Sequence, residues 1–230
     1  ENLAAGLWTR ERKQRILASR VESGKAIIAA LRQSSRRPDV LIQSSGINYY
    51  GAHGRQPVDE TCPPGSDFLA GVCLEWEKST QEAESLGVRR CVVRSGLVLE
   101  KSGGVLPLMS LPFRFFIGGK LGSGRQWISW IHLTDEIRAI DFLLRNSQAS
   151  GNFNLTAPQA LTNQDFSSAL GKALGSPAWL PTPAFAIKLA LGEMSTLALD
   201  GQQVLPARLQ EMGFEFQYPS LEAALHAIYQ

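Results

Sequence analysis

Residues 39–51 read Asp-Val-Leu-Ile-Gln-Ser-Ser-Gly-Ile-Asn-Tyr-Tyr-Gly, and this stretch decides the fold class. Its apolar run Val40–Ile42 is typical of a short strand buried on both faces, as in a parallel sheet. We expect Gln43–Gly46 to form a small polar turn after that strand. A helical pattern of apolar residues precedes the strand, from a capping Thr9 to the stop at Pro38.

The same order of elements repeats further along the chain. Apolar residues at helical spacing predict one amphipathic helix of about five turns over residues 66–86, with Gly87 at its C-terminus. Cys91–Val93 predicts a second short buried strand. Helices that alternate with buried strands favour an α/β fold with a parallel, Rossmann-like sheet and helical crossovers.

The local composition of the sequence changes after Val98, where glycines and prolines surround aromatic segments. We expect short strands near 128–131 and 151–156, an exposed-face strand at 214–216, and helices over 133–144, 163–174, 184–191 and 221–228. The sequence thus predicts two parts. Residues 1–98 form the rear part of a nucleotide-binding domain, and residues 99–230 form mainly a smaller α+β substrate lobe, with some elements returning to the first part.

Composition excludes several classes of protein. The 23 basic and 21 acidic residues leave a net charge of +2, too small a field for a nucleic-acid partner. No stretch approaches the roughly 18 apolar residues of a membrane span, so we expect no membrane partner. Three cysteines without metal spacing favour a reducing compartment. We therefore expect a cytoplasmic protein, with an organelle of a eukaryote as the alternative. With three histidines in the chain, a multi-histidine metal centre is not expected.

The strand end at residues 43–50 carries the candidate chemistry. In open α/β sheets, ligands bind at the carboxyl ends of the strands, where Ser44 and Ser45 follow Val40–Ile42. We expect these hydroxyls and Arg94, at the end of the next strand, to flank one cleft, with Tyr50 within reach. The alternative is that the serines satisfy backbone groups of a turn and the tyrosine packs in the core.

Several motifs together resemble the extended short-chain dehydrogenases/reductases. Residues 39–51 resemble their serine-containing strand end, 94–99 the segment beside the nicotinamide, and 130–135 a motif of their substrate lobe. Four further features resemble one atypical, epimerase-like subgroup, SDR family 39U, also labelled cell-division-inhibitor-like. They are Trp8 with Arg12-Lys13 and Ser19-Arg20; the glycine-rich stretch Gly118–Asp135; Val204-Leu205-Pro206; and Gly213-Phe214 with Tyr218-Pro219.

The resemblance implies an NADP(H) cofactor and a set of residues that bind it. By position in the family these are Glu1, Arg20, Ser44, Arg94, Leu97 and Val98. The chain matches no G-x-G-x-x-G motif, and the family's first βαβ unit would precede Glu1. We therefore expect the chain to lack the N-terminal Rossmann part and, without it, to bind a dinucleotide weakly.

The superfamily's Tyr-x-x-x-Lys pair, which donates the proton, occurs nowhere in the chain. Leu69 and Cys73 stand at the matching helical positions. As substitutes we expect Ser45 to orient the substrate and Tyr50 or His132 to donate a proton. The alternative for His132 is a structural hydrogen bond in the lobe, and Arg94 can instead brace a carboxylate.

Two functions follow from these observations. The first is an NADP(H)-binding oxidoreductase or epimerase-like enzyme for a small or nucleotide-sugar-like substrate, with a homodimer as a candidate assembly. The second is a catalytically silent nucleotide-binding regulator, with cell division as its candidate process, which the missing Tyr-x-x-x-Lys pair favours.

Overall fold

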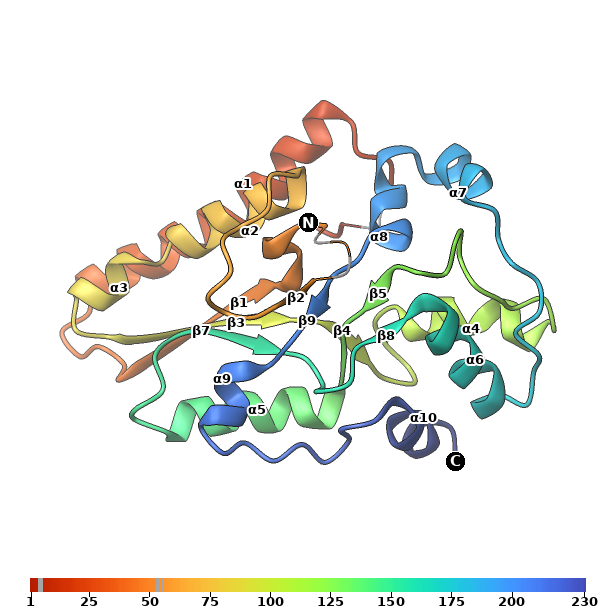
Figure 1. Cartoon of the computed structure of the whole chain (residues 1–230). Coiled ribbons are helices and arrows are strands. Elements are labelled where there is room, and N and C mark those ends of the chain that lie inside the picture. The colour runs from red at the N-terminus through yellow and green to blue at the C-terminus, as the bar shows by residue number, and fades with distance from the viewer. Residues whose placement is uncertain (4–5, 53, 55) are drawn as a thin grey trace.

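The computed structural model describes residues 1–3, 6–52, 54 and 56–230. Its centre is a three-stranded parallel sheet in the order β1 (Val40–Gly46), β3 (Arg89–Ser95) and β7 (Gly151–Leu155). The long helix α1 (Arg10–Gln33) and α2 (Phe68–Lys78) cover one face, and α5 (Leu133–Arg145) covers the other (Figure 1). The predicted α/β fold with a parallel sheet is confirmed.

The polar segment after Ile42 is strand and not the turn that the sequence predicted. Gln43–Gly46 continues β1 and pairs in parallel register with residues 92–95 of β3. Each backbone group that pairs with a neighbouring strand is satisfied there, so this pairing outweighs the turn preference of the serines. The consequence is that Ser45 lies directly beside Arg94 in the register.

The helix predicted over residues 66–86 is two helices. It breaks after α2 and resumes as α3 (Glu82–Ser85). At the break, Ser79 packs so closely on Gly24 of α1 that a Cβ there would overlap the Ser79 side chain. The Thr80 hydroxyl also donates to the Gln43 side chain in β1. Tertiary contacts at the break therefore overrule the helical periodicity.

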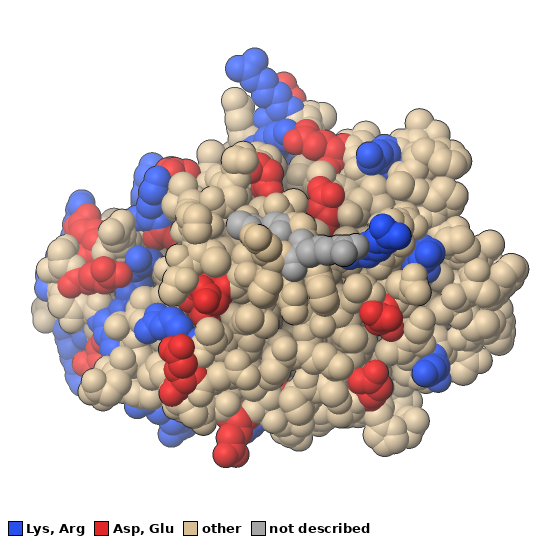
Figure 2. Space-filling model, viewed as in Figure 1, with Lys and Arg blue, Asp and Glu red and all other residues tan. Residues whose placement is uncertain are grey.

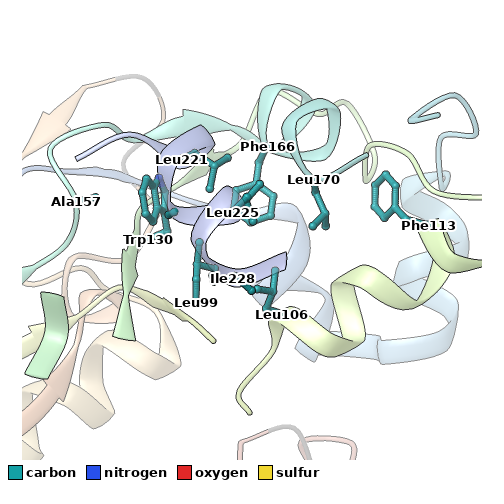
Figure 3. Packing of buried hydrophobic residues seen from close by; sticks show 11 residues of the cluster. Leu99, Leu106, Phe113, Trp130, Ala157, Phe166, Leu170, Leu221, Leu225 and Ile228 are labelled. Atoms are coloured by element: carbon teal, nitrogen blue, oxygen red, sulfur yellow. The ribbon is translucent and has the colours of Figure 1, made fainter. Parts of the chain in front are cut away.

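The lobe holds a hydrophobic core of its own. Figure 3 shows Trp130, Phe166, Leu225 and Leu99 packed together, all with less than 2% of their surface exposed. The elements around it are β4 (Leu97–Leu99), α4 (Leu106–Arg114), β5 (Trp127–Ile128), β6 (Trp130–His132), β8 (Leu161–Thr162), α6 (Asn163–Ala173) and α10 (Leu221–Tyr229).

Two expectations about the lobe need correction. Helix α4 was not predicted, because its two prolines suggest a break, yet Pro107 lies in the first turn, where no backbone N–H is needed. Residues 214–216 form no strand. Phe214 instead packs edge-on against Phe142 and Phe216, so the alternation there reflects an aromatic cluster.

The chain crosses back to the sheet after the lobe. Helix α7 (Ala184–Leu191), the turn η2 (Gly192–Ser195) and α8 (Thr196–Leu199) lead to β9 (Gln203–Val204), which pairs with β2 (Pro57–Val58). Helix α9 (Ala207–Glu211) then packs on β7, before the last helix returns to the lobe (Figure 1).

Acidic and basic side chains are both scattered over the face in Figure 2, with most of them over the sheet half. Among the described residues, none of the helices has the length and apolar character needed to cross a bilayer. Within the residues that the structure describes, no three or more His, Cys, Asp or Glu side chains are grouped so that they could hold a metal ion.

Candidate functional site

A cavity of about 360 Å³ opens where β1 and β3 end, and we call it the edge cavity. At the sheet edge it is lined by Ile47 and Asn48 of the 3-10 turn η1 (Ile47–Tyr50), by Ser95 at the end of β3, and by Gly96 and Leu97. The lobe supplies the remaining walls. The lining residues are Ile47, Asn48, Ser95, Gly96, Leu97, Val105, Met109, Leu121, Gln126, Trp127, Ile128, Ser129, Asn163, Leu197, Ala198, Asp200, Gly201 and Gln202.

A second cavity of about 210 Å³ adjoins it, and we call it the side cavity. The two cavities share Asn48, Leu197, Asp200 and Gln202 in their walls. The side cavity is further lined by Trp8, Gly51, Ala52, Asp67, Phe68, Leu69, Glu193 and Thr196. The two cavities therefore lie next to each other, between the carboxyl edge of the sheet and Leu69 on helix α2.

Amide side chains hold the walls of the edge cavity together. Gln202 Nε2 donates to the Ile47 carbonyl at 2.7 Å, which ties η1 to the segment before β9. Gln126 Nε2 donates to the carbonyls of Leu121 and Ala198 at 3.1 and 2.9 Å. Gly201 lies against the backbone of Trp127 so closely that any side chain would clash. Hydrogen bonds and close backbone packing therefore hold the segments that form the cavity walls against one another.

Ser95 brings a buried carboxyl group to the edge cavity. Its Oγ donates to Oε1 of Glu136 at 2.5 Å, and Glu136 is 9% exposed. Oε2 of Glu136 is buried and has no hydrogen-bond partner among the described residues. Burial raises the pKa of Glu136 to about 7, although the bond to Ser95 opposes the shift. This side chain can therefore carry a proton near neutral pH.

Sequence reasoning missed Glu136. An acidic residue in the first turn of a helix is expected from the helix dipole alone, so its position gave no signal. Its neighbour Asp135 is fully buried and accepts hydrogen bonds from the backbone N–H groups of Gln217 and Tyr218 at 2.9 and 2.8 Å. Two adjacent carboxyl groups thus have different surroundings, which the spacing of the residues does not reveal.

Ser45, Tyr50 and Arg94 lie together, but beneath packed side chains and outside the lining of both cavities. Arg94 Nε and Nη2 donate to the two oxygens of Glu77 at 2.9 and 2.8 Å. Ser45 Oγ donates to the same carboxylate at 2.7 Å. The neighbouring strands are placed as expected, but Arg94 braces a carboxylate, the second of its two predicted roles.

Tyr50 completes this buried network. Its hydroxyl accepts from Arg94 Nη1 at 3.0 Å and donates to Oδ1 of Asn154 at 2.6 Å. Burial raises the pKa of Tyr50 to about 12, against the opposing effect of Arg94. Burial would lower the pKa of Arg94, but Glu77 and Tyr50 together outweigh this effect and raise it. Tyr50 is fully buried, so this arrangement does not present it to a ligand.

His132 caps helix α5. Its Nδ1 accepts from the backbone N–H of Thr134 at 3.0 Å, and its ring stacks on Tyr218 with centroids 4.0 Å apart. Burial lowers the pKa of His132, although Asp135 opposes the shift. His132 lines neither cavity. The structure therefore places it in the structural role that was its predicted alternative.

The predicted cofactor residues fall into separate groups. Leu97 lines the edge cavity, whereas Val98 packs in the core between the sheet and α5. Ser44 is exposed on the edge strand β1. Arg20 Nη1 donates to the Glu1 carbonyl at 2.9 Å, and the guanidinium lies over the Trp76 ring. Burial lowers the pKa of Arg20.

The two helical positions that would carry Tyr and Lys are both mostly buried. Leu69 lines the side cavity, and Cys73 lies deeper, 7% exposed. Burial, with a contribution from Glu77, raises the pKa of Cys73 to about 11. Neither side chain can donate a proton near neutral pH, so this helix offers no replacement for the missing pair.

Comparison with known proteins finds relatives that match nearly the whole chain. Residues 182–228 match a family described as a domain of unknown function, DUF1731. An epimerase family protein of Staphylococcus aureus is 42% identical over 221 residues, covering 95% of this chain and 73% of the relative. The chloroplastic SDR39U1 homologue of Arabidopsis thaliana is 42% identical over 225 residues, covering 97% of this chain and 65% of that protein.

A solved structure agrees with this result. The crystal structure of the human epimerase family protein SDR39U1 (isoform 2) with NADPH superposes with a TM-score of 0.94. It is 31% identical, and the match covers 100% of this chain and 79% of the human chain.

Proposed function

Because the chain belongs to the epimerase family that includes SDR39U1, an atypical branch of the short-chain dehydrogenases/reductases, we propose that it is an NADP(H)-binding oxidoreductase or epimerase. Its substrate is a small molecule held in the edge cavity. The observation that carries this proposal is the position of the cavity at the carboxyl ends of two adjacent parallel strands. That edge is where ligands bind in open α/β sheets.

The residues present fit the cofactor at two places. Leu69 and Asn48 border the side cavity, which lies next to the edge cavity and suits the uncharged end of a reduced nicotinamide. Arg20, with Glu1 beside it, is a cation suited to a phosphate group. When bound, NADPH supplies a hydride. Residues 1–98 would then serve mainly the cofactor, and the lobe from residue 99 mainly the substrate.

Ser95 and Glu136 are the proton donors of this proposal. A carbonyl carbon that accepts a hydride leaves an oxygen that needs one proton to become a hydroxyl. Ser95 Oγ donates that proton at the cavity wall, and protonated Glu136 replaces it across their hydrogen bond. The reverse direction returns the proton to Glu136. Ser45 and Tyr50 contribute by fixing the ends of β1 and β3.

A second candidate is a catalytically silent nucleotide-binding regulator. The observation that favours it is the pair Leu69 and Cys73, which stand where the superfamily's proton donor and its lysine would face the nicotinamide. A role in cell division rests on the resemblance alone.

The two candidates separate in one set of measurements. NADPH is titrated by its fluorescence, and its oxidation is followed by absorbance against a panel of carbonyl compounds. If the protein is an enzyme, its turnover rate should fall at least about 100-fold in the Ser95→Ala and Glu136→Gln variants, because this is the usual contribution of a general acid. Ser168→Ala on the exposed face of α6 is the matched control. Saturable NADPH binding without turnover on any compound supports the regulator. Because the chain alone is expected to bind a dinucleotide weakly, these measurements use the chain joined to the family's first βαβ unit, and absence of NADPH binding by that protein refutes both candidates.

A further inference from the structure

We propose that the substrate of the edge cavity is a neutral, mainly apolar carbonyl compound or alcohol, and not a nucleoside diphosphate sugar. The inference rests on the proposed function, because it identifies the ligand of the same cavity. It replaces the nucleotide-sugar-like substrate that the family resemblance suggested. Three features of the cavity carry it: its apolar walls, the sign of its charges and the few polar atoms left free.

The walls of the edge cavity are mainly aliphatic and aromatic. Met109 and Val105 on the α4 side face Ile47 and Leu97 at the sheet edge. Further apolar side chains complete the wall: Leu121, Trp127, Ile128, Leu197 and Ala198. Sites of this kind gain affinity by burying the apolar surface of a ligand. At about 360 Å³ the cavity lies near the small end of the range for small-molecule sites.

The charged side chains that the structure describes in the linings of the two cavities have the wrong sign for a diphosphate. Among the described residues, neither cavity has Lys, Arg or His in its lining. The acidic residues are Asp200, shared by both, and Asp67 and Glu193 in the side cavity. Lys13 pairs with Glu193 of the side cavity, and Arg94 pairs with the buried Glu77. Diphosphates are normally held by Arg or Lys, and here they would meet carboxylates.

Most polar side chains of the edge cavity already have partners. Gln126, Gln202 and Asn163 bond to backbone groups of the walls, and Ser129 bridges Gln202 and Val204. Asn48 and Asp200 have no side-chain hydrogen bond in the described part of the chain, and Ser95 Oγ is bonded to Glu136. A compound with few polar atoms matches this small number of free groups. The many hydroxyls of a sugar would lose water without replacement, at a cost for each.

The test measures binding of two probes to the chain joined to the family's first βαβ unit and saturated with NADPH, by saturation-transfer NMR and by tryptophan fluorescence, to which the wall residue Trp127 contributes. The probes are 4-phenyl-2-butanone, a neutral ketone, and UDP-glucose. We expect saturable binding of the ketone and none of UDP-glucose at the same concentrations. Met109→Lys places a cation in the apolar wall and should weaken ketone binding by about tenfold or more. Leu108→Lys, on the same helix but 67% exposed, should leave it unchanged.

Each outcome decides the inference. Saturable binding of UDP-glucose that displaces the ketone overturns it, and so does ketone binding that Met109→Lys leaves intact. Failure of the ketone to bind while NADPH binds also overturns the substrate class, but leaves the proposed function in place. Failure of NADPH to bind, with ketone binding intact, refutes the proposed function instead.

Discussion

Replacing Arg94 by Met should unfold the protein at a much lower denaturant concentration. Arg94 is 1% exposed, and its two bonds to Glu77 are the main compensation for a carboxylate that is 7% exposed. After the replacement, Glu77 keeps only the Ser45 hydroxyl as a donor among the described residues. The Tyr50 hydroxyl also loses the guanidinium that donates to it.

The expected cost follows from removing one partner of a buried ion pair, about 3–5 kcal/mol of unfolding free energy. With a urea slope of about 3 kcal/mol per molar, expected for a chain of this size, the midpoint falls by roughly 1–1.7 M. Removing both charges in Arg94→Met with Glu77→Met should recover about 2 kcal/mol or more, because no uncompensated charge remains.

Urea unfolding followed by tryptophan fluorescence measures these midpoints. The control is Arg32→Met, which breaks a two-bond contact with Glu82 at the surface and should leave the midpoint nearly unchanged. A midpoint shift for Arg94→Met no larger than that of the control would refute the reasoning. A double variant less stable than Arg94→Met alone would refute it as well.

Three further predictions concern the residues around the cavity. The pKa of Glu136 is raised to about 7 in the folded protein, so the native state holds its proton more tightly than the unfolded chain. The free energy of unfolding of the protein should therefore fall by up to about 3 kcal/mol as pH rises from about 4.5 to 7, and level off above pH 7. Thermal unfolding of the Glu136→Gln variant should not show this fall. Tyr50→Phe leaves the fully buried Asn154 Oδ1 without its donor, which should cost about 1–3 kcal/mol in urea unfolding. NADPH titrations of that variant should match the parent, and a large loss of affinity would mean that Tyr50 contacts the ligand. His132→Ala removes the cap of α5 and should cost about 1 kcal/mol, whereas His132→Asn should retain most of the stability, because Asn also caps helices. Equal thermal midpoints for the two His132 variants would contradict the capping role.

The sequence predicted the elements that have a strong local signal. The apolar runs at Val40–Ile42 and Cys91–Val93 identified two neighbouring strands of the sheet, because short runs of mainly β-branched residues are typical of strands buried on both faces. The break between α2 and α3 escaped prediction because it depends on Gly24, far away in the chain. Tertiary contacts of this kind leave no trace in local periodicity.

The site that we propose lies at the edge of the sheet that the sequence indicated, but the residues predicted for it, Ser45, Tyr50 and Arg94, lie beneath the cavity. A hydroxyl or a guanidinium at a strand end can face a cleft or an opposite charge, and the sequence alone does not state which. Glu77 accepts the hydrogen bonds of Ser45 and Arg94, but it lies near the C-terminal end of the amphipathic helix α2, close to the exposed Glu75, and nothing in the sequence distinguishes the two. Glu136 escaped notice for the same reason.

Because the chain returns from the lobe to the sheet, the segment after residue 183 is held to the preceding part of the chain by hydrogen bonds. Gln202 bonds to η1, Leu205 N–H donates to Val58, and Arg208 donates to Asn152 of β7. A protease nick in the exposed stretch 179–183, between α6 and α7, would therefore sever the backbone without separating the pieces. Such a nicked protein would run as two bands on a denaturing gel and as one particle on a sizing column.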